Sequence, residues 1–121
     1  MKYVIDMKLP SLNDYIGVCR SNKYQASKYK AKLEQEIGLF LTKMPKWTNP
    51  IKIHFHWTER KKKRDLDNIA FAKKFILDAM QKYGKLENDN SKYVAGFSDS
   101  FTYSKDGSFK VVIEIEELKG E

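Results

Sequence analysis

Residues 51–83, IKIHFHWTERKKKRDLDNIAFAKKFILDAMQKY, contain two different hydrophobic periods in succession. Over 51–58 apolar and polar side chains alternate, which is typical of a half-buried strand. Over 67–83 the apolar residues recur at helical spacing, and Gly84 is suited to cap the C-terminus of such a helix. A highly charged connection, residues 59–68, joins the two patterns. This stretch therefore predicts a strand, a charged connection and a helix.

The rest of the chain extends this pattern on both sides. Alternation predicts three more strands, over 2–9, 92–103 and 108–116, and helical spacing predicts a helix over 26–44. Residues 10–24 lack a period and are expected to form a long ordered loop, whereas Asp106-Gly107 within 104–107 signals a hairpin. The predicted fold is α+β in one domain, residues 1–121, with the order β-α-β-α-β-β. We expect a mixed four-stranded sheet with two helices packed on one face.

The composition is that of a globular protein of 121 residues, with 41% hydrophobic and 32% charged residues. The one cysteine, Cys19, excludes an intrachain disulfide and makes a cysteine-based zinc site improbable. No apolar run approaches the ~20 residues needed to cross a bilayer. We therefore expect a cytoplasmic protein with no membrane partner.

The net charge of +7 is unevenly distributed. Residues 20–85 hold 17 basic and 6 acidic side chains, a local charge of +11, whereas residues 86–121 hold 4 basic and 8 acidic side chains, a local charge of −4. A basic middle indicates a polyanionic partner, most simply a nucleic acid, although a merely soluble basic protein fits the charge equally well.

The charged connection holds the strongest candidate for chemistry. Five consecutive cations, Arg60, Lys61, Lys62, Lys63 and Arg64, precede Asp65-Leu66-Asp67. Either acid could simply cap the following helix, but that explains one aspartate better than two. Two acids at i and i+2 of an extended segment point to the same side and could share a Mg²⁺ ion, which prefers oxygen ligands. The adjacent cations would then bind the flanking phosphates of a nucleic acid.

Two further groups of residues bear on this hypothesis. At about 100° per residue Lys74 lies two turns below Asp67, where its ammonium could stabilise charge on a phosphoryl group, although an ordinary solvated lysine fits the spacing equally well. Lys73 points away from that line and is expected to be ordinary surface. His54 and His56 share one strand face, but without a third ligand they are better interpreted as packing or solvent-facing residues than as a zinc site.

These motifs resemble the RusA family of Holliday junction resolvases. The resemblance rests on Lys63-Arg64-Asp65-Leu66-Asp67-Asn68, then Lys74 and Asp78-Ala79-Met80, then Gly84 and a second acidic loop at Asp89. The segment Leu9-Pro10-Ser11-Leu12-Asn13 is similar to the Pro-Ser-x-Asn stretch near the start of that family. The resemblance covers roughly residues 3–115.

The resemblance implies a magnesium-dependent endonuclease that acts as a homodimer on four-way DNA junctions in recombination and repair, in a bacterial cell or a phage-infected host. It assigns Asp65, Asp67 and Asp89 to a metal site for Mg²⁺, with Mn²⁺ as a possible substitute and with Asn88 or Glu87 as an additional ligand. It makes Lys74 the catalytic lysine. We expect Arg60, Lys61, Lys62, Lys63, Arg64 and Asn13 to contact DNA.

Two other functions remain open from the sequence. One is a non-catalytic domain that binds branched DNA or RNA and uses the aspartates only as caps. The other is a nuclease of the same chemistry whose substrates are flaps or forks.

Overall fold

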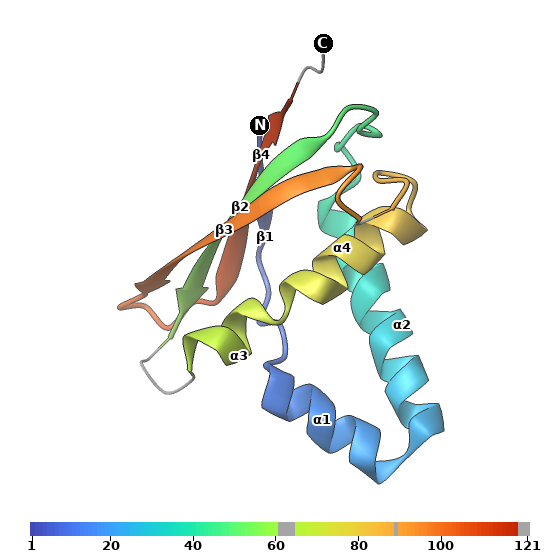
Figure 1. Ribbon diagram of the computed structural model, residues 1–121. Coiled ribbons are helices and arrows are strands. Elements are labelled where there is room, and N and C mark those ends of the chain that lie inside the picture. Colours follow the sequence, from blue (N-terminus) through green and yellow to red (C-terminus); the bar gives the residue numbers. More distant parts are fainter. Residues whose placement is uncertain (61–64, 89, 119–121) are drawn as a thin grey trace.

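The protein forms one twisted sheet covered by helices on one face, as a computed structural model shows for residues 1–60, 65–88 and 90–118 (Figure 1). The strands are β1 (Lys2–Ile5), β2 (Ile51–Glu59), β3 (Val94–Tyr103) and β4 (Lys110–Glu117). The helices are α1 (Leu12–Ser21), α2 (Lys23–Phe40), α3 (Leu66–Ala70) and α4 (Lys73–Lys82). The predicted α+β class and the mixed four-stranded sheet are confirmed.

The sheet has the strand order β1-β4-β2-β3. β2 lies between β4, with which it pairs antiparallel, and β3, with which it pairs parallel. β1 forms one edge of the sheet and pairs antiparallel with β4, and β3 forms the other edge. The mixed character of the sheet therefore comes from a single parallel pair, β2 and β3.

The predicted hairpin at 104–107 is wrong, because β3 and β4 are separated by β2. The connection instead passes the end of β2, where the Ser104 amide donates to the Glu59 carbonyl at 2.8 Å. Gly107, with φ +80°, makes the turn that Asp-Gly predicts. The turn was recognised correctly, but β2, whose inward residues are almost fully buried, takes the central position between the two strands.

Helix α1 replaces the loop predicted over 10–24. Its N-terminus is a capping box: the Asp14 amide donates to Ser11 Oγ at 3.2 Å, and the Ser11 amide donates to the Asp14 carboxylate at 3.0 Å. The helix has no fully buried residue, so its sequence lacks the apolar stripe on which the prediction depended. The same Asn22 that ends α1 caps α2 through its side chain.

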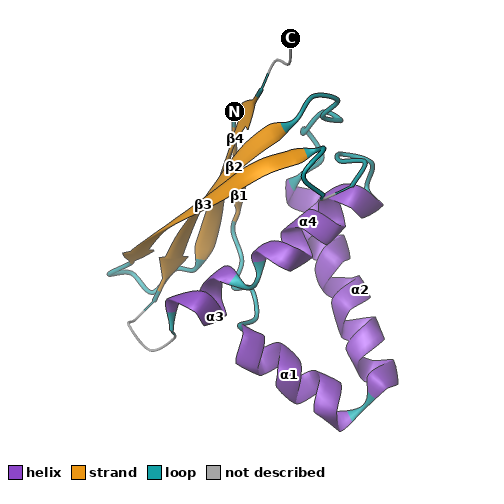
Figure 2. Cartoon of the chain, viewed as in Figure 1, coloured by secondary structure: helices purple, strands orange, loops and turns teal. Residues whose placement is uncertain are grey.

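The helix predicted over 67–83 is interrupted after Ala70, as the two purple segments α3 and α4 in Figure 2 show. Around the interruption the amides bond three residues back: Ala72 to Ile69 at 3.2 Å and Phe75 to Ala72 at 3.0 Å. Such tightened turns change the rotation per residue, so the positions on α4 are no longer in phase with Asp67.

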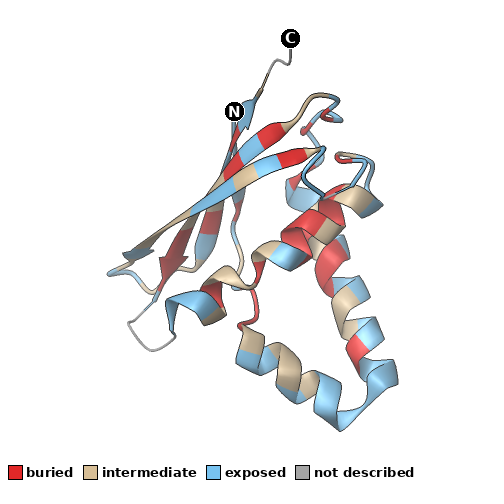
Figure 3. Cartoon of the chain, in the orientation of Figure 1, coloured by how far each residue is buried: buried red, intermediate tan, exposed pale blue. Residues whose placement is uncertain are grey.

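The core lies between the sheet and helices α2 and α4, where the buried segments in Figure 3 face one another. The odd-numbered residues of β2 point into it, and Phe55 is completely buried. Within the described part of the chain, no helix combines the length and the apolar character that a membrane crossing requires.

Candidate nucleic-acid and metal site

The acid pair lies where the chain enters α3. Asp65 occupies the N-cap position with extended backbone angles, φ −65° and ψ 145°, yet its side chain makes no capping hydrogen bond. Asp67 lies in the first turn, and both side chains are exposed. The expected extended Asp65–Asp67 segment is wrong, because the helix already begins at Leu66. Among the described residues, the carboxylate of Asp65 nevertheless has no capping hydrogen bond.

Only part of the predicted DNA-contacting set lies within the described residues. Arg60 is exposed at the end of β2, and its side chain lies against Gly107. Asn13 is exposed in the first turn of α1, two residues before Tyr15, whose ring packs on Phe71 and Phe75 with centroid distances of 6.1 and 5.1 Å. This packing places the start of α1 beside the junction of α3 and α4. Four of the predicted cations lie outside the described residues: Lys61, Lys62, Lys63 and Arg64.

The two neighbouring lysines of α4 have different surroundings. The Lys74 ammonium lies 3.6 Å from Asp78, one turn farther along α4, and its side chain is 58% exposed. The Lys73 ammonium lies 2.6 Å from Asp99 on β3 and is 22% exposed. The expectation that Lys73 is ordinary surface is therefore wrong, because the interruption after Ala70 turns this residue toward the sheet.

Asp99 is a residue that the sequence argument missed. Its two carboxylate oxygens accept from Trp57 Nε1 at 2.9 Å and from Lys73 at 2.6 Å. The Lys73 ammonium also lies over the rings of Phe55 and Phe97, 5.5 and 5.4 Å from their centroids. The signal was present in the sequence: Asp99 occupies an inward position of the alternating strand, where an acid needs a partner. This cluster fixes the first turn of α4 against the sheet.

A second ion pair fixes α4 against α2. Lys30 lies 2.9 Å from Asp78, and the hydrogen bond to this carboxylate is the main reason that the pKa of Lys30 is raised. Asp78 belongs to the Asp78-Ala79-Met80 motif, and Ala79 and Met80 are completely buried. In this structure the motif therefore connects α4 to α2 and to the core.

The second acidic loop lies at the other end of the sheet. Asp89 is outside the described residues, but its neighbours Asn88 and Asn90 are exposed, and the Asn90 carbonyl accepts from the Val94 amide at 2.9 Å. Val94 pairs with Ile51 at the start of β2, whereas the chain leaves the far end of β2 toward Asp65. Nine strand residues, roughly 30 Å, separate these two ends. Among the described residues, no three His, Cys, Asp or Glu side chains come together as a metal site.

The two histidines face away from the helices and take part in a chain of hydrogen bonds with β3. Both ring nitrogens of His54 are bonded, to Ser98 at 2.6 Å and to Ser100 at 2.8 Å. His56 bonds Ser100 through Nδ1 and Thr102 through Nε2. Each ring nitrogen thus has a hydroxyl partner, in agreement with a packing role on the open face of the sheet.

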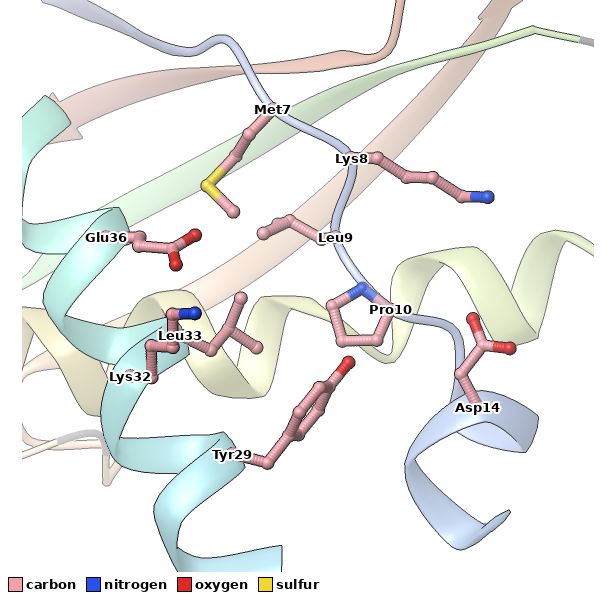
Figure 4. A pocket seen from close by; sticks show the side chains of 9 residues that line it. All are labelled: Met7, Lys8, Leu9, Pro10, Asp14, Tyr29, Lys32, Leu33 and Glu36. Atoms are coloured by element: carbon pink, nitrogen blue, oxygen red, sulfur yellow. The ribbon is translucent and has the colours of Figure 1, made fainter. Parts of the chain in front are cut away.

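A cavity of about 390 Å³ lies between α2 and the segment that connects β1 to α1 (Figure 4). Leu9, Pro10 and Leu33 form apolar walls, and Tyr29 points toward the same space. Burial, followed by the charges of Asp14 and Glu36, raises the pKa of Tyr29. None of the predicted site residues lines this cavity, so it is separate from the acid pair.

The comparison with protein families confirms the resemblance that the sequence indicated. The endodeoxyribonuclease RusA family matches residues 2–116 of the 121-residue chain. No curated protein matches the chain.

Proposed function

Since the chain belongs to the RusA family of endodeoxyribonucleases, which resolve Holliday junctions, we propose that it cuts four-way DNA junctions by magnesium-dependent phosphodiester hydrolysis. The observation that carries this proposal is the state of Asp65. This residue occupies the N-cap position of α3, but its exposed carboxylate makes no capping hydrogen bond to a described residue, and it lies two positions before the exposed Asp67. An exposed carboxylate that makes no capping hydrogen bond and directly follows five cations is suited to a phosphodiester site.

In the proposed site Asp65 and Asp67 hold the divalent cation, for which Mn²⁺ could substitute. Exposed carboxylates are hard oxygen donors, which is the ligand type that Mg²⁺ prefers together with water and substrate phosphate. When bound, the cation would polarise the scissile phosphate and lower the pKa of the attacking water. The two aspartates would fix the position of the cation, and this position would determine where the scissile phosphate binds.

Lys74 is proposed to stabilise the negative charge that develops on the phosphoryl group. The neighbouring Lys73 is less suited to this role, because its ammonium already contacts Asp99 and two aromatic rings. Lys74 is more exposed, and its i,i+4 pair with Asp78 is of a kind worth only about 0.3–0.5 kcal/mol. Its ammonium can therefore leave that pair at little cost when a phosphate arrives.

The cations bind the DNA backbone in this proposal. Arg60 to Arg64 directly precede the acid pair in sequence, and Asn13 lies on the neighbouring α1. Such contacts position the substrate without reading its sequence.

Two symmetric nicks require two acid pairs, so we propose a homodimer. One chain has one Asp65–Asp67 pair, and a four-way junction has twofold character. Asn88 and Asn90 lie at the opposite end of β2 from the acid pair of their own chain. We therefore propose that Asp89 acts with Asp65 and Asp67 of the second subunit.

The substitution Asp65→Asn tests the metal site. It removes a charged oxygen and keeps the side-chain shape, so single-turnover nicking of a synthetic four-way junction in magnesium should fall by about a hundredfold or more. Binding measured by gel shift in chelator should hold or improve, since a negative charge near the phosphates is lost. Asp6→Asn, at an exposed acid beyond β1, serves as the matched control and should leave both measurements unchanged.

Retained nicking by the Asp65→Asn variant would remove Asp65 from the site. Absence of magnesium-dependent nicking in the parent protein, with junction binding intact, would favour the non-catalytic binding domain. Faster cutting of flaps or forks than of junctions would change the substrate and keep the chemistry.

A further inference from the structure

Two lysines share one carboxylate where helices α2 and α4 pack side by side (Figure 1). The ammoniums of Lys30 on α2 and Lys74 on α4 both approach the same oxygen, Asp78 Oδ2, at 2.9 and 3.6 Å. This oxygen is shielded from solvent, and the Asp78 side chain is only 17% exposed. Since water does not reach the oxygen, a neighbouring cation has to balance its negative charge.

Lys30 is the closer of the two partners and the less exposed one. Its side chain is 34% exposed, against 58% for Lys74. Asp78, chiefly through a hydrogen bond, raises the pKa of Lys30, so this lysine stays charged at neutral pH. Because Lys30 already neutralises Asp78 at 2.9 Å and also repels the other ammonium, the attraction left for Lys74 is weak.

The second acid of this helix contact, Glu34, has a cation of its own. Its carboxylate lies 4.0 Å from Lys30 and 4.0 Å from Lys82, and its side chain is 11% exposed. If Lys30 lost its charge, Glu34 would therefore keep Lys82. Asp78 would keep only Lys74 among the cations that pair with it in the described part of the chain.

We propose that Lys30 is a positioning residue, which neutralises Asp78 and thereby keeps the Lys74 ammonium free to reach the phosphate. The inference rests on the proposed function, in which Lys74 stabilises charge on the phosphoryl group. Without Lys30, the shielded oxygen of Asp78 would draw Lys74 into a closer ion pair, because a largely buried carboxylate without a cation is strongly unfavourable. Lys74 would then have to leave that pair before it could meet a phosphate.

Lysine acetylation measures the state of Lys74 in chelator and without DNA, independently of nuclease activity. A limiting amount of acetic anhydride is added, and mass spectrometry gives the extent of labelling at Lys74. Lys30→Met removes the charge and keeps most of the side-chain length, so labelling of Lys74 should fall by about threefold or more. Asp78→Asn removes the anion and should raise the labelling. Lys32→Met, at an exposed lysine of the same helix, is the matched control and should leave it unchanged.

Single-turnover nicking of a four-way junction separates a positioning role from a purely structural one. Lys30→Met should slow nicking by about tenfold at normal junction binding, since Lys74 is held back by Asp78. Asp78→Asn should nick at least as fast as the parent protein, since it leaves Lys74 free. A purely structural ion pair predicts slowing by both variants, because each breaks the same contact. Lys30→Arg keeps the charge and should restore the parent rate. All variants are assayed at a temperature where they remain folded.

Unchanged labelling of Lys74 in the Lys30→Met variant, or equal slowing of nicking by Lys30→Met and Asp78→Asn, would overturn the inference. If Lys30→Met does not fold, Lys30→Gln takes its place, because the amide still donates to Asp78 but carries no charge. A parent protein that cuts no junction would remove the proposed function. In that case opposite changes in Lys74 labelling, a decrease in Lys30→Met and an increase in Asp78→Asn, would still show that Lys30 keeps Lys74 free.

Discussion

At the scale of single residues, adjacent lysines on α4 have different roles. Lys73→Ala leaves Asp99 and the Trp57 indole in a mostly buried cluster without their cation, so the free energy of unfolding should fall by about 1–3 kcal/mol. Lys74→Ala removes an i,i+4 pair whose lysine is largely exposed, and Asp78 keeps its closer partner Lys30, so the free energy of unfolding should fall by only about 0.3–0.5 kcal/mol. Urea denaturation of the two variants measures both values.

The order of the two effects should be reversed for the nicking rate, where Lys74→Ala is expected to have the larger effect. Lys74→Ala should reduce single-turnover nicking by about a hundredfold at normal junction binding, because it removes a group proposed to stabilise developing charge. Lys73→Ala, assayed at a temperature where it remains folded, should have a mild effect. If the Lys73→Ala variant is folded but nicks slowly, and the Lys74→Ala variant nicks at the normal rate, the catalytic lysine is Lys73.

At the scale of elements, the connection from β3 to β4 depends on Asp106. Hydrogen bonds from Ser104 and Ser108 lower the pKa of Asp106 to about 2. Because the folded pKa lies below that of the unfolded chain, this carboxylate stabilises the loop above pH ~4 and loses that effect as the pH falls toward 2. Carboxyl NMR titration should give a pKa near 2, and Ser104→Ala should raise it toward 4. An unchanged pKa in that variant would show that Ser104 is not the main cause.

Contact between α2 and α4 depends on a glycine. A Cβ added at Gly38 would lie 2.6 Å from Cε2 of Tyr83, so Gly38→Ala must displace that ring. We expect Gly38→Ala to destabilise the parent protein. In a Tyr83→Ala background the same change should stabilise it by about 1 kcal/mol, since alanine has the higher helix propensity. A double-mutant cycle by urea denaturation measures this coupling, and additive effects would show that the ring moves aside freely.

The sequence predicted elements well where they bury an apolar stripe. The hydrophobic periods predicted strand β2 and the buried face of α4 correctly, because the apolar residues of both elements are buried in the core. Helix α1 was missed because none of its residues is fully buried, so its sequence shows no apolar stripe, and the Ser11–Asp14 capping box that begins it was not recognised. The separation of β3 from β4 by β2 was missed because turn chemistry is local, whereas strand order depends on contacts between distant parts of the chain.

The sequence indicated which residues are candidates for the site, but it did not indicate correctly how they are arranged in space. Asp65 and Asp67 stand out in the sequence because five cations directly precede them, and their role as metal ligands stays a prediction. The phase argument for Lys74 assumed a continuous helix, and the short-range hydrogen bonds at Ala72 and Phe75 interrupt it. Asp99 was missed because its partners Trp57 and Lys73 are 42 and 26 residues away in the sequence.

At the scale of the whole molecule, the separation of Asp65 from the Asn88–Asn90 loop bears on which chain completes each site. If Asp89 serves the acid pair of the partner, mixing Asp65→Asn chains with Asp89→Asn chains should restore activity. In a mixed dimer one site then carries both substitutions and the other carries none. Random exchange gives mixed dimers in half of the population, so about a quarter of the sites should be active. Single-turnover nicking after subunit exchange measures this fraction.

The reciprocal mixture tests the same exchange with the opposite readout, a loss of activity in place of a recovery. When parent chains are mixed with chains that carry both Asp65→Asn and Asp89→Asn, each site of a mixed dimer has one defect if the sites are shared between subunits. Activity should then fall below that of the parent chains alone, whereas sites built within one chain would keep it. No recovery in the first mixture and no loss in the second, with exchange confirmed by differently labelled chains, would place each site within a single chain. The opposite pair of results requires that one subunit supplies the Asp65–Asp67 end of β2 and the other supplies the loop beside Asn90.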